Sequence, residues 1–406
     1  MPRLRILVIA LIVDGTDVGE TWSGFHWVKA MAEVMDVTLL CMQRPGRTPT
    51  AEQLPGVRVI SWPEPAFLSR FERARAMLKP AWPLFVRHVR RWLADALARG
   101  ERFDIAHQLL PQAMRHPSPL RHFALPYVVG PLGGSLATPP AFEKEVGGGG
   151  GLARLRAFDG FRLRHDPALR AGYARAGAIL GVAPYVGRTL ADAEVAVRRF
   201  ETVLERSADP IAHGSGRSTA AGTVRLLHVG RCVRTKGLRD AVRALARLGD
   251  LPGVTLTSAG DGPDLAACKA EAEALGVADR VDFLGKVSRD RVEQLYADHD
   301  IFCFPSFREP MGGVFFEALR WGLPVISARR GGPEAIVDES CGLLIPVETP
   351  DQFAAAIADA IRTLAGDPAL RARLGNGAHR RLQSFGGWSD KARWLESLYR
   401  QVIAAA

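Results

Sequence analysis

Two glutamates and a glycine pair stand close together in the stretch FREPMGGVFFEAL, residues 307–319. Because Gly312 and Gly313 precede an apolar run, we expect them to open a helix, whose free N–H groups and positive dipole end bind anions such as phosphate. Glycine also lets a ligand approach the backbone closely. Glu317, about one turn further on, can accept hydrogen bonds from sugar hydroxyls, and Glu309 would face the ligand from before the turn. The alternative is a pair of ordinary solvated glutamates.

A second stretch, VGRCVRTKGL, supplies two cations, Arg231 and Lys236, directly after the apolar run Val224–Val229. Ligands of parallel sheets bind at the carboxyl ends of the strands, where both cations would lie. There they can hold a diphosphate, each charge-assisted contact contributing ~1.5–3 kcal/mol, and they can stabilise a departing diphosphate without a metal. The alternative is that both are surface charges of a basic loop.

The elements that must position these residues follow one pattern along the chain. Apolar runs alternate with segments of helical spacing, in the second half as VRLLHVG, VTLTSAG, VDFLG, IFCFPS, PVISA and CGLLIPV. The first half has the same pattern with longer interruptions. Strands that are apolar throughout belong inside a parallel sheet covered on both faces. We therefore predict an α/β protein with two doubly wound, Rossmann-like domains that face each other across a cleft.

The boundary between the domains is expected in RSADPIAHGSGRSTAAG, because its glycine, serine and proline content is typical of a linker. The first domain then spans residues 1–205 and the second spans 206–386. A helical tail, residues 387–406, is assigned to the first domain. The glycine run 147–151 is interpreted as a loop within the first domain.

Composition excludes several classes of protein. A chain of 406 residues is long enough for two domains, and 47% hydrophobic with 24% charged residues is the profile of a soluble globular protein. The five cysteines lie far apart without a CxxC pair, which favours reduced thiols in the cytoplasm over disulfides or a zinc site. The run Ile6–Val13 is too short to span a bilayer and no cleavage site follows it, so we interpret it as a buried strand rather than a signal peptide.

The positive charge is confined to one half of the chain. Residues 1–200 hold 27 Lys and Arg against 17 Asp and Glu, whereas the remaining residues hold 26 of each, so the first half carries the whole net charge of +10. Its partner is expected to be an anionic surface or an anionic substrate.

Six motifs in a fixed order resemble the retaining glycosyltransferases of family 4, which have the GT-B fold. They are HVGRCVRTKG, LTSAGDGPDL, VDFLGKVSRDRVEQLY, FPSFREPMGGVFFEAL, GLPVIS and GGPEAIV with CGLLIPV. Each motif alone is weak, but the ordered set is specific. The resemblance covers most of the chain and is densest between Val224 and Val347.

The resemblance implies roles for residues of the second domain, the nucleotide-sugar-binding domain. Glu309 would hold the donor sugar near the reacting carbon, and Glu317 would bind the nucleotide ribose. Arg231 and Lys236 would neutralise the diphosphate, and Val287 would touch the nucleobase through its main chain. Gly312 matches the glycine whose backbone lies against the donor.

The first domain, implied to bind the acceptor, matches less well. Gly19 stands where the family has a double glycine near the donor phosphate, but Glu20 replaces the second glycine. His107 matches an active-site histidine, although the usual second histidine of that motif is Leu109 here. For His107 the alternative is a histidine hydrogen-bonded at a strand end. The loop GPLGGS, residues 130–135, would face the cleft and the acceptor.

The implied reaction transfers a sugar from a nucleoside-diphosphate sugar to an acceptor hydroxyl with retention. The resemblance suggests a front-face displacement in which the leaving diphosphate helps to take the acceptor proton. The protein would supply position and charge stabilisation, with no cofactor and no metal. Asp298 and Asp300 form an Asp-x-Asp pattern, but they precede a strand and so lie at the wrong end of it for a ligand site.

Two stretches, residues 68–102 and 154–176, concentrate arginine. In the first of them Phe71, Trp82, Phe85 and Trp92 lie among the arginines, a composition typical of helices on anionic membranes. A cytoplasmic protein held at the membrane face would then use a lipid-linked or saccharide acceptor, as in cell-envelope polysaccharide or glycolipid assembly. A solvated, salt-bridged helix face is the alternative.

Three other functions are alternatives to sugar transfer. A GT-B-fold sugar-nucleotide epimerase would turn over a nucleotide sugar without an acceptor, and it lacks the ordered motifs. The positive charge suggests a nucleic-acid-binding protein, but there is no helix-turn-helix, zinc or RNA-binding signature, and we expect no nucleic-acid partner. A dinucleotide-dependent oxidoreductase lacks the G-x-G-x-x-G after the first strand.

Overall fold

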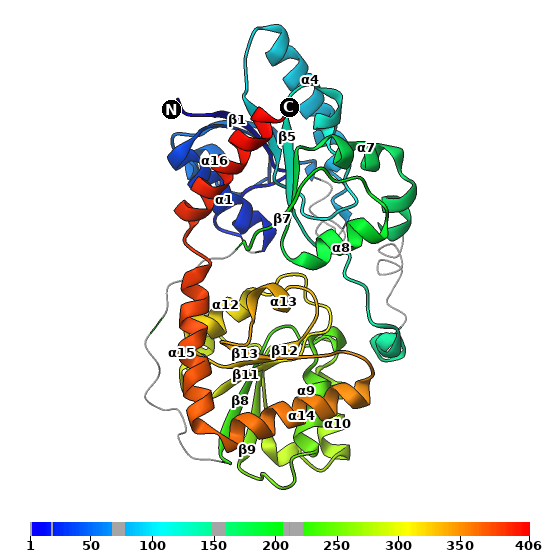
Figure 1. Ribbon diagram of the computed structural model, residues 1–406, viewed down its shortest axis with the longest axis vertical. Coiled ribbons are helices and arrows are strands. Elements are labelled where there is room, and N and C mark those ends of the chain that lie inside the picture. The colour runs from blue at the N-terminus through cyan, green and yellow to red at the C-terminus, as the bar shows by residue number, and fades with distance from the viewer. Residues whose placement is uncertain (1, 18, 67–77, 148–158, 206–210, 212–221) are drawn as a thin grey trace.

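The computed structural model describes residues 2–17, 19–66, 78–147, 159–205, 211 and 222–406. The described residues form two parallel sheets, each the centre of an α/β domain, and Figure 1 shows the two domains stacked along the long axis of the molecule. The expected fold class, two doubly wound α/β domains, is confirmed.

The first sheet has seven strands in the order β3-β2-β1-β4-β5-β6-β7. Their bounds are β1 (Arg5–Ile9), β2 (Asp36–Gln43), β3 (Arg58–Pro63), β4 (Ile105–Gln108), β5 (Tyr127–Leu132), β6 (Ala178–Gly181) and β7 (Phe200–Thr202). Alternate residues of β1 pack into different cores, with Leu7 and Ile9 on one face of the sheet and Ile6 and Val8 on the other. Burial of both faces explains why the strand is apolar throughout.

Helices cover both faces of this sheet. They are α1 (Glu20–Val34), α2 (Thr50–Gln53), α4 (Trp82–Ala98), α7 (Pro167–Arg175), α8 (Pro184–Asp192) and α16 (Trp388–Ala404), with the short 3₁₀ turn η2 (Pro119–His122). The 3₁₀ turn η3 (Pro140–Phe142) and the short helix α5 (Glu143–Val146) come from the same part of the chain but pack on the second domain. The run Ile6–Val13 is entirely buried and contains most of β1, as expected. In the described part of the chain no helix has the length and apolar character needed to cross a membrane.

The second sheet has six strands in the order β10-β9-β8-β11-β12-β13. Its strands are β8 (Val224–Val229), β9 (Val254–Ala259), β10 (Val281–Gly285), β11 (Ile301–Phe304), β12 (Val325–Ala328) and β13 (Gly342–Ile345). The helices are α9 (Leu238–Ala246), α10 (Leu265–Ala274), α11 (Arg289–Asp298), α12 (Gly313–Arg320), α13 (Pro333–Ile336), α14 (Pro350–Gly366) and α15 (Pro368–Ser384), with 3₁₀ turns η4 (Arg234–Lys236) and η5 (Ala278–Arg280). Strand order reverses between β8 and β11, so a ligand is expected beyond the carboxyl ends of these two strands.

The chain returns to the first domain at its end. Figure 1 shows α15 beside the second sheet and α16 beside α1. Leu395, Leu398 and Tyr399 of α16 share a core with β1 and α1, and the ring of Trp388 lies edge-on to that of Trp27 at 5.4 Å. Helix α16 therefore ties the carboxyl end of the chain to the first domain.

Helix α4 corrects one expectation about the basic stretches. Trp82 and Phe85, expected beside arginine on a membrane-facing side, are buried in the first core, and Trp92 is half-buried against it. Because an amphipathic helix turns its apolar side to the core, α4 leaves arginines such as Arg87 and Arg90 exposed. Phe71 and the arginines of residues 70–75, 154 and 156 lie outside the described residues.

Candidate active site at the carboxyl ends of β8 and β11

Helix α12 begins where the glycine pair predicted. Gly312 is its N-cap with φ 89°, a left-handed conformation that favours glycine. A Cβ at this position would lie 2.5 Å from Cδ2 of Phe315 and 2.9 Å from Cγ of Glu309. The first glycine is therefore required both by the backbone conformation and by close packing against Glu309.

Lys236 and Glu309 form an ion pair beside this helix start. Lys236 ends η4, which follows β8, and Glu309 lies in the loop after β11, the neighbouring strand. Their side chains are 21% and 10% exposed, and the Lys236 ammonium also lies 5.7 Å from the ring centroid of Phe304. The sheet thus brings together two residues that are 73 positions apart in the sequence.

The two loops that carry this pair are tied to each other. Ser306 Oγ donates a hydrogen bond to the carbonyl of Thr235 at 3.0 Å. A Cβ on Gly237 would lie 2.1 Å from the carbonyl oxygen of Pro305, so the loops touch backbone to backbone. The N–H of Gly332 donates to the carbonyl of Glu309 at 2.8 Å. The position of the ion pair is therefore determined by the backbone around it.

Glu317 lies on α12, beyond the helix start. The buried phenol of Tyr296, on α11, donates a hydrogen bond to Glu317 Oε2 at 3.1 Å. Burial raises the pKa of Tyr296 well above its usual value, and the Glu317 carboxylate adds to that rise. Tyr296 thus stays a hydrogen-bond donor that orients Glu317. The expected ribose contact of Glu317 stays a prediction.

The other residues predicted to bind the nucleotide-sugar donor lie on loops at the carboxyl edges of the sheets. Arg231 is exposed just after β8, and Val287 is half-buried just after β10. Gly19 of the first domain is the N-cap of α1 with φ 72°, and it is exposed. The structure brings Lys236 and Glu309 into contact. Arg231, Val287 and Gly19 lie next to strand or helix ends, and their binding roles remain predictions.

His107 is fully buried in the first domain. It lies in β4 with 0% of its surface exposed, and its ring is hydrogen-bonded through Nε2 to the carbonyl of Gly130 at 2.6 Å and through Nδ1 to the hydroxyl of Tyr399. Burial lowers the pKa of His107 to about 4, so the ring is neutral at pH 7. This geometry fits the alternative, a hydrogen-bonded histidine in a strand, with partners on β5 and α16, and we leave His107 out of the proposed reaction.

Tyr185, which the sequence did not single out, lies on the first-domain side of the site. It is the second residue of α8, which follows β6, and its hydroxyl donates a hydrogen bond to the carbonyl of Gly134 in the expected cleft loop at 3.1 Å. Burial raises the pKa of Tyr185, the hydrogen bond to Gly134 partly offsets this rise, and the charge of Glu309 adds to it. The sequence feature that could have identified Tyr185 is an aromatic residue shortly after the end of a strand.

Further contacts join the domains near this point. Arg188 of α8 forms an ion pair with Glu334 of α13. Figure 1 shows α8 at the lower edge of the first domain, opposite α12 and α13 of the second. The carboxyl edges of the two sheets therefore face each other, and the candidate site lies between them.

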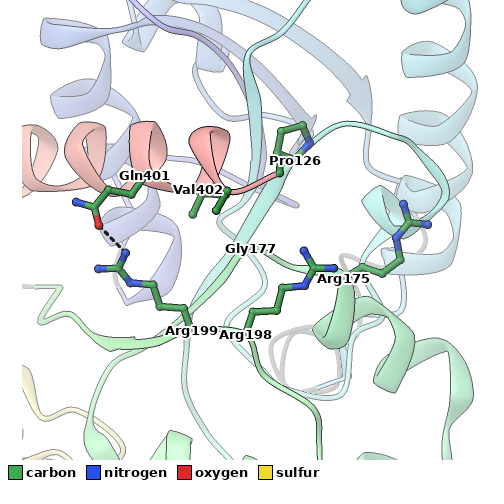
Figure 2. A pocket seen from close by; sticks show the side chains of 9 residues that line it. Pro126, Arg175, Gly177, Arg198, Arg199, Gln401 and Val402 are labelled. Carbon is green, nitrogen blue, oxygen red and sulfur yellow. Dashed lines mark hydrogen bonds between the residues drawn. The ribbon is translucent and has the colours of Figure 1, made fainter.

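Two other features that could suggest a site lie at the amino ends of strands. Asp300 accepts hydrogen bonds from Arg225 at 2.8 and 3.2 Å at the amino end of β11, and the described residues hold no cluster of three metal-ligating side chains. A pocket of about 260 Å³ is lined by Arg175, Arg198 and Arg199 (Figure 2), which precede β6 and β7. That is the amino edge of the first sheet, opposite the edge where such sheets bind ligands.

Part of the chain, including this site, is similar to known proteins. Residues 218–381, which include Lys236, Glu309 and Glu317, match the family model Glycosyl transferases group 1. The lipopolysaccharide core biosynthesis glycosyltransferase LpsE of Rhizobium meliloti is 33% identical over 202 residues, which are 47% of this chain and 56% of that protein. The D-inositol 3-phosphate glycosyltransferase of Corynebacterium glutamicum is 35% identical over 184 residues, 43% of each chain. The chain thus spans about half the length of these relatives.

Solved structures match the whole chain. Anabaena Alr3699/HepE in complex with UDP has a TM-score of 0.68 at 17% identity and covers 98% of this chain and 100% of that one. Sucrose-phosphate synthase from Thermosynechococcus elongatus has a TM-score of 0.66 at 21% identity and covers 100% of both chains. The fold is GT-B, as the motifs indicated, and the matched family model supports a transferase enzyme.

Proposed function

We propose that the protein is a glycosyltransferase that moves a sugar from a nucleoside-diphosphate sugar to an acceptor hydroxyl. One observation carries the proposal: the partly buried Lys236–Glu309 pair lies beside the glycine-started helix α12, within the segment that matches a glycosyltransferase family model. The cation and the helix N-terminus can bind the diphosphate of a nucleotide sugar, and the carboxylate can bind the hydroxyls of its sugar.

Donor binding would exchange the partners of this pair. A diphosphate competes for the Lys236 ammonium, because phosphate oxygens are strong acceptors of charge-assisted hydrogen bonds. Glu309 is then released to accept hydrogen bonds from the sugar hydroxyls, and Arg231, exposed after β8, is available as a second cation. HepE, which shares the fold, was solved with UDP and glucose and with UDP-glucose, and this supports a nucleoside-diphosphate sugar as donor.

The proposed chemistry is a metal-independent transfer with retention. Retaining glycosidases use two carboxylates about 5–5.5 Å apart, one of them the nucleophile, and we assign no such nucleophile here. The departing diphosphate takes the acceptor proton while Lys236 and the N–H groups at the start of α12 stabilise its charge. The protein contributes orientation and a fixed electrostatic environment.

The proposed acceptor is a cell-envelope saccharide or a lipid-linked glycan. Support comes from relatives named as lipopolysaccharide core glycosyltransferases and from the positive charge of the first half of the chain. With Trp82 and Phe85 buried, attachment to an anionic membrane would depend on exposed arginines, each contributing about 1 kcal/mol. Binding to anionic vesicles that weakens with salt would support this attachment.

The test is a screen of UDP-, GDP- and ADP-sugars for hydrolysis and transfer, with and without EDTA. We expect transfer that survives EDTA and falls by orders of magnitude in Lys236→Ala and Glu309→Ala. Lys29→Ala and Glu348→Ala, which remove exposed charges elsewhere, serve as matched controls and should keep full activity. Full activity in either site variant removes that residue from the site. Conversion of the nucleotide sugar into its epimer without an acceptor would favour an epimerase, and salt-sensitive nucleic-acid binding without turnover would contradict the proposal.

A further inference from the structure

A segment of the first domain crosses to the second domain and docks on it. Figure 1 shows the teal chain leaving the first domain and ending in a short helix, α5, beside the second. We call residues 136–146 the strap. Along its course Arg330 donates a hydrogen bond to the carbonyl of Ala137 at 2.8 Å, and Arg308 donates to Thr138 Oγ1 at 3.0 Å. The strap is therefore held by residues that flank the candidate site.

Phe142 anchors the strap in the core of the second domain. Its side chain is 0% exposed, and its ring centroid lies 4.5 Å from that of Phe307 and 6.0 Å from that of Phe353. These three rings belong to one continuous core with α9, α14 and the second sheet. A residue of the first domain thus completes the packing of the other domain.

Glu145 adds an electrostatic anchor. Its carboxylate accepts hydrogen bonds from Arg234 Nε at 2.7 Å and from Arg243 at 3.0 Å. The Arg234 side chain is only 4% exposed, also donates two hydrogen bonds to Asp240, and lies 5.5 Å from the ring of Phe142. Burial alone would raise the pKa of Glu145, but the two arginines outweigh it and lower the pKa. Glu145 is therefore ionised and completes the charge balance around a buried guanidinium.

Both anchors act on the elements that carry the site. Arg234 stands two positions before Lys236 in η4, and Phe307 stands two positions before Glu309 in the loop after β11. We propose that Phe142 and Glu145 are positioning residues that hold Lys236 and Glu309 in place and fix the separation of the two domains. The part that concerns Lys236 and Glu309 rests on the proposed function.

The physical consequence is a cost for domain separation. Moving the first domain away would pull Phe142 out of an apolar core and leave Arg234 buried with one carboxylate fewer, and both changes are unfavourable. Domain motion and the geometry of the site are thereby coupled through one short segment.

Kinetics of matched variants test the coupling to the site. For Phe142→Ala we expect kcat/KM for the nucleotide sugar to fall at least tenfold, with most of the loss in kcat, and Phe142→Leu should recover most of it. Glu145→Gln should lose about threefold, whereas Glu143→Gln, an exposed carboxylate two positions earlier, should stay within twofold. Wild-type kinetics in Phe142→Ala would overturn the proposal. If that variant does not fold, equal kinetics for Glu145→Gln and Glu143→Gln would overturn it.

A distance measurement tests the domain arrangement without sugar transfer. The five native cysteines are buried, so spin labels at Leu97→Cys on α4 and Leu275→Cys after α10, which are 38% and 43% exposed, report on the separation of the domains. We expect a narrow distance distribution that broadens in Phe142→Ala and in Glu145→Gln. An unchanged distance distribution in both variants would refute the proposal that the strap fixes the separation of the domains. A wild-type protein that transfers no sugar would instead refute the proposed function and leave this measurement valid.

Discussion

Replacement of Gly312 by alanine tests whether the start of α12 shapes the site. Two costs follow from the structure: a left-handed backbone at φ 89°, about 1 kcal/mol for a residue with a Cβ, and a Cβ within 2.9 Å of Glu309 Cγ and 2.5 Å of Phe315. Overpacking of this kind costs about 1–3 kcal/mol. We therefore expect Gly312→Ala to lower the free energy of unfolding by about 2–4 kcal/mol and to displace Glu309.

Gly276→Ala is the matched control for this variant. Gly276 has φ 68° but nothing within 4 Å of its Cβ position, so it carries the backbone cost without the packing cost. Urea unfolding followed by circular dichroism measures stability, and donor-sugar transfer measures the site. Gly276→Ala should lose about 1 kcal/mol and keep full activity, whereas Gly312→Ala should lose more stability and most of its activity. Equal stability and activity in the two variants would refute the reasoning.

Two further predictions concern buried ionisable groups. The pKa of His107 is about 4 in the folded protein and 6.5 in the unfolded chain, so its contribution to stability is present above pH 6.5 and is lost as the pH falls towards 4. Between pH 7 and pH 5 this amounts to about 2 kcal/mol, and urea unfolding should show a smaller loss in His107→Gln; an equal loss would contradict the assignment. Asp240→Asn leaves Arg234 buried with a weakened partner and should lower the free energy of unfolding by about 3–5 kcal/mol, whereas Asp250→Asn, which removes an exposed partner of Arg362, should change it little. A small effect of Asp240→Asn would show that the cluster is not needed for stability.

The strands were predictable because burial on both faces demands continuous apolar runs, and β1, β8 and β11 follow such runs directly. No apolar run predicts the strand β7, because Phe200–Thr202 is three residues long and contains a glutamate. Short edge strands take their position from the neighbouring strand, here β6, and carry no pattern of their own.

The candidate site was predictable only in part. Gly312, Lys236 and Glu309 follow from strand ends and local motifs, since parallel strands bring their carboxyl ends to one edge of a sheet. Phe142 could not be assigned to the second domain, because a single aromatic residue in a loop does not indicate which core it enters. His107 was ambiguous for a related reason: its partners, Gly130 and Tyr399, come from distant parts of the sequence.

The central claim is that the donor diphosphate binds between Lys236 and the start of α12. The most direct test is a crystal structure of the complex with the nucleoside-diphosphate sugar that the screen identifies. We predict that the Lys236 ammonium leaves Glu309 and lies about 2.7–2.9 Å from a phosphate oxygen, with Glu309 on the sugar. A diphosphate bound elsewhere, for example among the arginines of Figure 2, with the Lys236–Glu309 pair intact, would contradict the account.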